Sequence, residues 1–247
     1  EVYDEDDPII TNAARATLDA IQTRVGWAQT LDLTLDGLSL ASIYFLAAIG
    51  LAITFGQMGV INMAHGEFIM MGAYTGYVVQ LILPNYTVSL IVALPLAFAI
   101  TFGAGIVMER LVIRHLYHRP LETLLATFGI SIALQQIAKN IFGTQARPLT
   151  SPDWLGGALV ISDVIQISYI RIAIVLALVF LFALLYILKR TRLGLEVRAV
   201  TQNPGMAASM GINPDRINMM TFGLGSGIAG VAGVGIGLYA QVTSEMG

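Results

Sequence analysis

Long hydrophobic runs alternate along the chain with short polar connections. A helix that crosses a bilayer needs about 20 mostly apolar residues, and several segments approach that length. The candidate spans are residues 38–55, 60–83, 88–108, 124–142, 172–188 and 219–240. The fourth is the weakest, because Gln135, Gln136 and Lys139 interrupt it. This pattern predicts an all-α, polytopic helical bundle with about six transmembrane spans.

The first 36 residues differ from the rest and are expected to face water. They carry eight acidic and two basic residues, while Ile9, Leu18, Ile21 and Val25 recur at roughly helical spacing. We interpret 1–36 as an external amphipathic helix and 37–247 as the transmembrane domain. The chain begins with Glu1 rather than Met, so we expect that an upstream segment, for example a signal peptide, is missing.

Composition and charge support a membrane protein with a defined orientation. Only 12% of the residues are charged and 56% are hydrophobic, and that charged share is about half the soluble average. Five of the thirteen basic residues lie in the connection 189–216, and Arg110, Arg114 and Arg119 lie in the connection two spans earlier. Cytoplasmic loops are enriched in Lys and Arg. We therefore expect both connections inside and the acidic N-terminus outside.

The connection 189–216 contains residues that typically start and end helices. Asn203 is a favourable N-cap, Pro204 suits the first helical position, and Gly211 can close the helix in a left-handed turn. This predicts a helix of about two turns, with Met206 and Met210 one turn apart on one face. A second helix start follows at Asn213, Pro214 and Asp215. The segment either anchors two spans or docks a soluble partner, and spacing alone leaves both open.

A polar cluster stands at the start of the second candidate span. Asn62, His65 and Glu67 lie within six residues, beside Gly59 and Gly66. Ionisable groups in a membrane segment usually face a bundle interior or a water-filled cavity, and transporters break glycine-interrupted segments at their binding sites. We expect a broken helix at 60–67 that lines a translocation pathway. The alternative is a structural role, which we favour for His65 rather than for the other two residues.

Several classes of function lack the residues that they need. Cysteine is absent, and His65 and Glu67 do not have the spacing of a helical zinc motif, so we expect no metal site. The two lysines, Lys139 and Lys189, follow Ala138 and Leu188, whereas a P-loop requires Gly-Lys. We therefore expect no cofactor on this chain and no catalytic residues. Any ATP that drives transport would be bound by a partner ATPase.

Two motifs carry a family resemblance. Residues 56–67, GQMGVINMAHGE, and residues 191–212, TRLGLEVRAVTQNPGMAASMGI, resemble the signature and the coupling loop of permease subunits of ABC importers for branched-chain amino acids and related solutes. Within this family, three segments are most similar in sequence to the urea permease branch: FGQMGVINMAHGE, RPLETLLATFGISIALQQ and AVTQNPGMAASMGI. Ala207, Ala208 and Gly211 fit the Ala-Ala-x-x-Gly part of the coupling motif, and Met206 stands where many ABC permeases have Glu.

The resemblance implies a bacterial inner-membrane importer, with urea as the leading solute and branched-chain amino acids as the alternative. It implies a second permease subunit, ABC ATPase subunits on the cytoplasmic side, and a periplasmic solute-binding protein, without nucleic acid. Family members continue with further spans, so we expect the transmembrane domain to be incomplete at its C-terminus. The ATPase-coupling residues that it implies are Asn203, Pro204, Met206, Ala207, Ala208, Met210 and Gly211.

Two further hypotheses compete with an importer. An intramembrane serine hydrolase could pair Ser226 with His65, although Ser226 lies in a glycine run typical of helix packing. A passive channel or ion-coupled carrier would need no ATPase and would give residues 204–211 no role in transport. A bulky charge at Ala207 would then leave transport unchanged, whereas an importer would lose it.

Overall fold

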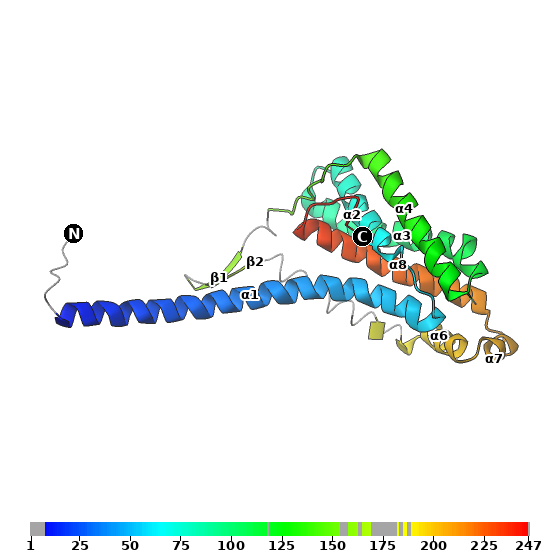
Figure 1. The fold of residues 1–247 in the computed structure, drawn as a ribbon, viewed down its shortest axis with the longest axis horizontal. Coiled ribbons are helices and arrows are strands. Elements are labelled where there is room, and N and C mark those ends of the chain that lie inside the picture. The colour runs from blue at the N-terminus through cyan, green and yellow to red at the C-terminus, as the bar shows by residue number, and fades with distance from the viewer. Residues whose placement is uncertain are drawn as a thin grey trace.

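The computed structural model describes residues 8–117, 119–153, 158–162, 165–168, 182, 185–186 and 189–246. Their backbone is mainly helical, as expected, and Figure 1 shows a helical bundle from which the first half of the longest helix projects. The helices are α1 (Pro8–Met58), α2 (His65–Ile82), α3 (Tyr86–Leu111), α4 (Pro120–Phe142), α6 (Arg192–Gln202), α7 (Pro204–Ser209) and α8 (Pro214–Tyr239), with a 3₁₀ turn η1 (Ile113–His115) after α3.

Helix α1 is longer than the sequence pattern indicated. The expected external helix is present from Pro8, but it continues without a break through residues 36 and 37 into the first candidate span. Residue 36 is therefore not the end of a helix, whereas the external position of the first 36 residues stays a prediction. Proline is the strongest helix breaker, and none occurs between Pro8 and Pro84. Gly26 and Gly37 lie inside α1 and only lower its helix propensity.

The described residues contain four helices long and apolar enough to cross a membrane, fewer than the six expected. They are Arg15–Met58, Tyr86–His115, Pro120–Phe142 and Pro214–Tyr239. The second candidate span was expected to start at residue 60, but its helix, α2, begins at His65. α2 has only 18 residues, which include the polar residues His65, Glu67 and Gln80, and it is not one of the four. The fifth candidate span, 172–188, lies almost entirely outside the described residues.

Helix α8 is the centre of the bundle and packs against α1, α2 and α3. Of an apolar 18-residue stretch of α8, 67% is buried inside the protein, whereas the figure for the corresponding stretches of α3 and α4 is 22%. The glycines explain this close contact. A side chain on Gly72 of α2 would overlap the backbone of Gly230, and one on Gly233 would overlap the backbone carbonyl of Ile69. The small residues thus allow α2 and α8 to touch backbone to backbone.

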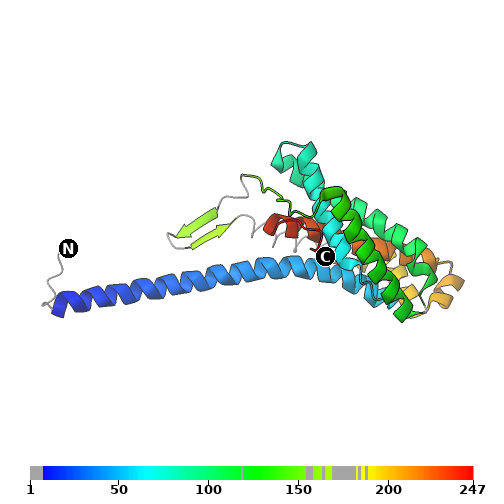
Figure 2. The same ribbon diagram turned by 45° about the horizontal axis from the view of Figure 1, so that its top comes forward.

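A short hairpin departs from the expected all-helical class. Strands β1 (Ala158–Ser162) and β2 (Ile165–Ser168) pair antiparallel within the connection that follows α4. Their sequences, ALVIS and IQIS, are rich in β-branched residues, which favour extended backbone. Figures 1 and 2 show the hairpin alongside α1, which β2 contacts.

The C-terminal end of α8 is tied to the same connection. The backbone N–H groups of Arg147 and Val242 donate to each other's carbonyl oxygens at 2.8 Å. Lys139, near the end of α4, donates to Glu245 at 2.9 Å, and this hydrogen bond lowers the pKa of Glu245. The ends of α4 and α8 thus lie together at one end of the bundle.

Candidate functional site

The polar cluster at residues 62–67 lies where the chain breaks between α1 and α2. α1 ends at Met58, and Gly59 takes a left-handed conformation with φ of 63° that turns the chain out of the helix. Residues 59–64 are not helical, and Asn62 Oδ1 accepts a hydrogen bond from the Ala64 backbone N–H at 3.0 Å. The break therefore ends at Ala64, so that Glu67 lies in the first turn of α2.

His65 and Glu67 face different neighbours although only two residues separate them. His65 Nε2 lies 3.0 Å from the backbone oxygen of Ala47 on α1. Glu67 Oε1 accepts hydrogen bonds from Ser131 Oγ and Gln135 Nε2 on α4, both at 2.8 Å. One residue thus joins α2 to α1 and the other joins α2 to α4.

A polar stripe on α4 receives the start of α2. Thr127 Oγ1 accepts a hydrogen bond from the Met63 backbone N–H at 3.1 Å, and Ser131 and Gln135 follow at spacings of four residues. Residues four apart lie on one face of a helix. Gln135, which weakens the fourth candidate span, therefore belongs to a face of α4 turned toward α2. Sequence reasoning did not single out Ser131 or Thr127, although their four-residue spacing carried the signal.

Each of the three pathway candidates keeps one buried polar atom without a partner among the described residues. These atoms are Asn62 Nδ2, His65 Nδ1 and Glu67 Oε2, and the side chains are 4%, 8% and 2% exposed. A buried polar group without a hydrogen bond is uncommon in native proteins and calls for an explanation. The Glu67 carboxylate can accept from an N–H donor, whereas the Asn62 amide can donate.

The helix predicted in the connection 189–216 is present as α7. Asn203 Oδ1 accepts from the Met206 backbone N–H at 2.9 Å, and Pro204 occupies the first position. Gly211 has a φ of 83°, and the Ile212 backbone N–H donates to the Ala207 oxygen at 3.0 Å. The predicted cap, first position and left-handed turn are confirmed. The helix itself is shorter than two turns.

One face of α7 is buried and the other is open. Ala207 is 4% exposed and packs in an apolar cluster with Val200 of α6 and Ile217 of α8. Met206 and Met210 are 66% and 79% exposed. Met206 lies on α7 and Met210 is the residue that follows this helix, so the two exposed side chains lie close together at the surface. α7 therefore rests on the two helices beside it and presents the methionines outward.

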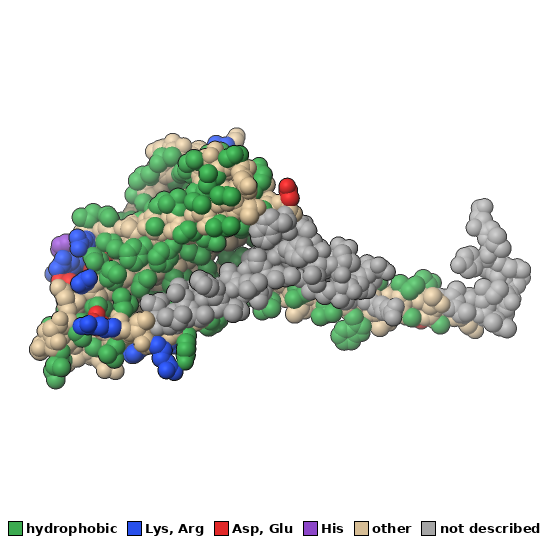
Figure 3. Space-filling view, turned by 180° about the vertical axis from the view of Figure 1, so that it is seen from behind, with side chains coloured by type: hydrophobic (Ala, Val, Ile, Leu, Met, Phe, Trp, Pro, Cys, Tyr) green, Lys and Arg blue, Asp and Glu red, His purple; other side chains and the backbone are tan. Residues whose placement is uncertain are grey.

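The two basic connections meet at the same end of the molecule. Arg114, in η1 after α3, forms an ion pair with Asp215 in the first turn of α8. Arg110 Nε also lies 3.1 Å from the sulfur of Met219. Figure 3 shows Lys and Arg side chains gathered mainly at the end that carries α6 and α7. This confirms that both connections share one side.

Polar residues are also buried beneath that basic end. Tyr117 donates a hydrogen bond to Glu109, which is 1% exposed at the end of α3, and it also contacts Asn218 of α8. Gln57, near the end of α1, donates to Asn218 Oδ1 at 3.4 Å. Burial and the contact with Glu109 raise the pKa of Tyr117 far above its usual range, so the phenol stays a neutral donor. Sequence reasoning did not identify this network.

Comparison with known proteins identifies the family. Residues 33–247 match the family described as Branched-chain amino acid transport system / permease component. The chain belongs to this permease family.

Relatives of the permease share about a third of its residues. It is 30% identical to the high-affinity branched-chain amino acid transport system permease protein BraD of Pseudomonas aeruginosa, over 86% of this chain and 72% of the relative. It is 31% identical to the corresponding protein LivH of Escherichia coli, over 84% of this chain and 70% of the relative. No solved structure matches it.

The permease is therefore a membrane-embedded, non-catalytic transport subunit, as its sequence predicted. The geometry also argues against the hydrolase hypothesis. Ser226 Oγ donates to the Phe222 backbone oxygen within α8 at 2.9 Å, while the His65 ring bonds to Ala47. Neither hydrogen bond joins the two residues. The motif sequences favoured the urea branch, but the names of these two relatives specify branched-chain amino acids.

Proposed function

We propose that this permease carries branched-chain amino acids inward as one subunit of an ATP-driven importer, with α7 as the docking helix for a separate ATPase. The observation that carries the proposal is the outward pair Met206 and Met210 on α7. The names of the relatives favour this substrate over urea. Without an acidic residue at position 206, docking on α7 depends on shape and apolar contact.

The packing of α7 supports a mechanical role. Ala207 is seated between Val200 and Ile217, so a force on α7 reaches both α6 and α8. α8 contacts α1, α2 and α3, so its movement would change the whole bundle. ATP would bind to the ATPase subunits, and the energy of its hydrolysis would enter the permease through α7. The coupling residues of the sequence analysis, from Asn203 to Gly211, act here as one rigid unit.

The proposed pathway uses the unpartnered atoms at the start of α2. The free carboxylate oxygen of Glu67 would accept from the α-ammonium group of an amino acid, and the Asn62 amide would donate to its carboxylate. Ser131 and Gln135 hold the other Glu67 oxygen and thereby fix the carboxylate. The free Nδ1 of His65 gives this residue a secondary place in the pathway, beside its contact with α1.

Family membership supports the remaining parts of the proposed importer. A second permease subunit would complete the pathway, and a periplasmic solute-binding protein would deliver the amino acid. The basic end that carries α7 would lie in the cytoplasm of a bacterial inner membrane, in accordance with the positive-inside rule. The N-terminus would then lie outside.

Urea remains the second candidate for the transported solute, because residues 55–67 and 199–212 are most similar in sequence to the urea branch. A neutral urea molecule would use its N–H groups on Glu67 and would need no countercharge. An amino acid is zwitterionic, so it gains more from a charged partner.

The decisive experiment measures uptake of labelled leucine and labelled urea by the full-length complex in proteoliposomes, with binding protein outside and ATP inside. We expect ATP-dependent leucine uptake that urea does not reduce. Urea uptake without leucine uptake would move the permease to the urea branch and keep the coupling argument. Uptake of either solute without ATP would contradict the importer and support a passive channel.

A further inference from the structure

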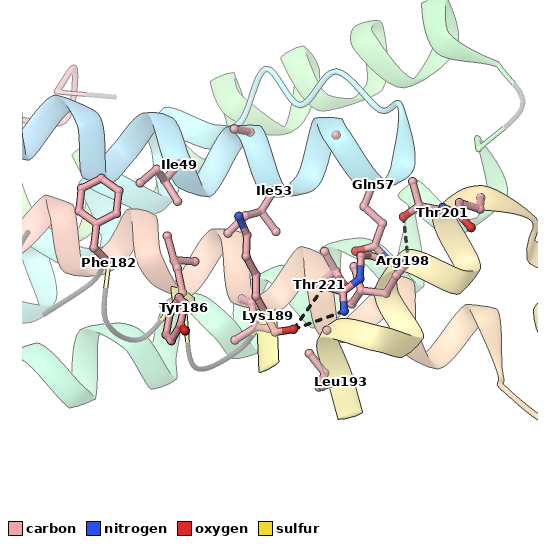
Figure 4. A pocket seen from close by; sticks show the side chains of 17 residues that line it. Ile49, Ile53, Gln57, Phe182, Tyr186, Lys189, Leu193, Arg198, Thr201 and Thr221 are labelled. Carbon is pink, nitrogen blue, oxygen red and sulfur yellow. Dashed lines mark hydrogen bonds between the residues drawn. The ribbon is translucent and has the colours of Figure 1, made fainter. Parts of the chain in front are cut away.

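A large crevice opens on the side of the bundle at the basic end. It lies between α1, α6 and α8, and its volume is about 880 Å³. Phe182, Leu185, Tyr186 and Lys189 also line it. Figure 4 shows side chains from these elements converging on it. The crevice is separate from the contact between α2 and α4 that holds Glu67.

One part of the crevice is apolar and lies beside membrane-spanning helices. Ile49 and Ile53 of α1 and Leu224 of α8 line it, and all three belong to candidate spans. The nine residues of α1 from Ile49 to Gln57 span roughly 12 Å along the helix axis. This depth suits a stretch of hydrocarbon chain.

The other part of the crevice carries positive charge without an acidic partner. Neither Lys189 nor Arg198 makes an ion pair among the residues that the structure describes, and Arg198 donates only to the Lys189 backbone oxygen, at 3.3 and 3.4 Å. Figure 4 shows the Lys189 side chain extending from the backbone among the residues that line the crevice. Both basic side chains are exposed, so they are accessible to an anion that enters the crevice.

Two uncharged polar atoms near the cations also lack partners. Thr221 is 1% exposed and lines the crevice, yet its Oγ1 has no hydrogen bond within the described part of the chain. The buried Oε1 atom of Gln57 is in the same situation. A ligand with a polar head would supply the missing partners.

We propose that the crevice binds one anionic phospholipid, with its acyl chains along α1 and α8 and its phosphate at Lys189 and Arg198. Basic pockets between membrane helices are suited to anionic lipid head groups. Free phosphate would leave the apolar part empty, and a zwitterionic lipid would bring a cationic group toward the two basic side chains. Because α6 forms one wall and adjoins α7, the lipid would brace the proposed docking helix.

Native mass spectrometry of the delipidated full-length permease complex tests this proposal directly. The complex is titrated with phosphatidylglycerol and with phosphatidylcholine of identical acyl chains. We expect one phosphatidylglycerol to bind saturably and phosphatidylcholine to bind far more weakly. The double variant Lys189→Gln, Arg198→Gln should bind phosphatidylglycerol about 30-fold more weakly, since each basic residue contributes about fivefold. Arg192→Gln is the control, because Arg192 pairs with Glu196 and does not line the crevice.

A second variant tests the apolar part and leaves both cations in place. Gly56 lines the crevice, and a Cβ atom added to it meets nothing within 4 Å, so Gly56→Leu should fill the space without displacing protein atoms. We expect weaker phosphatidylglycerol binding. Gly103→Leu is the control, since Gly103 also has open space around it but lies outside the crevice.

Three outcomes would overturn the proposal. Equal binding of the two lipids would mean that the cations select nothing. Phosphatidylglycerol binding that neither the double variant nor Gly56→Leu weakens would place the lipid elsewhere. Displacement of the lipid by inorganic phosphate at matching concentration would indicate a phosphate site without a role for the acyl chains.

Discussion

Gln135 on α4 donates a hydrogen bond to Glu67 on α2, with 2.8 Å between Nε2 and Oε1. Ser131 donates to the same oxygen, so one carboxylate oxygen is held by two donors and the other is left without a partner among the described residues. Two polar residues of the fourth candidate span therefore position the buried acid of α2. This arrangement lets Glu67 join two helices through one oxygen and leaves the other oxygen for the proposed contact with a solute.

Glu67→Gln should reduce transport without unfolding the permease. The side-chain oxygen of glutamine can still accept from Ser131 and Gln135, so the contact with α4 remains. Hydrogen bonds to charged groups contribute about 1.5–3 kcal/mol, so loss of the charge should lower kcat/KM for leucine by about tenfold to a hundredfold. Uptake assays and the melting temperature are measured together. The control is Glu122→Gln, an exposed glutamate at the start of α4. An unchanged rate would remove Glu67 from the pathway.

Replacing Met206 and Met210 by Ser should release the ATPase. Both side chains are exposed, so the change should leave the permease itself intact. Burial of a methionine at an interface contributes about 1.5–3 kcal/mol, and loss of both should weaken ATPase binding tenfold or more. Co-purification and ATP-dependent uptake should fall together. Leu81→Ser, an exposed leucine at the far end of α2, is the matched control. If the methionine variant and the control behave alike, α7 is not the docking helix.

Gly233→Ala should push α2 and α8 apart. The added methyl group would overlap the Ile69 backbone carbonyl, which has no flexible side chain to move aside. Overpacking of this kind costs about 1–3 kcal/mol, seen as a lower melting temperature. Gly129→Ala on α4 is the control, because its Cβ atom meets nothing within 4 Å. Alanine is the better helix former, so this variant should be unchanged or stabler by up to about 1 kcal/mol.

Tyr117→Phe should destabilise the basic end and alter the response to alkali. Glu109 would lose its donor while it stays buried, at a cost of about 1–3 kcal/mol. The raised pKa of Tyr117 gives a stabilising contribution that is complete below about pH 10 and is lost as pH rises through the folded-state pKa. Denaturation between pH 8 and 11 should therefore show a steeper alkaline loss in the natural protein than in the variant. Equal slopes would contradict the buried, neutral phenol.

Membrane orientation can be tested with single cysteines, because the natural sequence has none. Glu122→Cys lies at the basic end, and Tyr86→Cys lies at the exposed start of α3. An impermeant maleimide added to intact spheroplasts should label position 86 and should reach position 122 only after permeabilisation. The reverse pattern would place the basic end, and α7 with it, outside.

The sequence alone was sufficient to predict features that depend on residues close to one another in the chain. The side chains of Asn203 and Asn213 cap helices because their acceptors reach backbone N–H groups three residues ahead. Gly211 ends α7 because glycine tolerates a positive φ. The apolar run lengths and the low share of charged residues likewise predicted a membrane-embedded helical bundle. The division of the chain into an external segment, 1–36, and a transmembrane domain, 37–247, stays a prediction.

Tertiary structure decided what depends on residues far apart in the chain. His65 and Glu67 are close in sequence, but their positions on α2 turn one toward α1 and the other toward α4. No periodicity in the sequence could show which helices lie there. The Arg114–Asp215 pair and the crevice beside α6 have the same origin. Sequence patterns determine which segments form helices and which faces are apolar, whereas the partners of buried polar atoms follow only from how the helices pack.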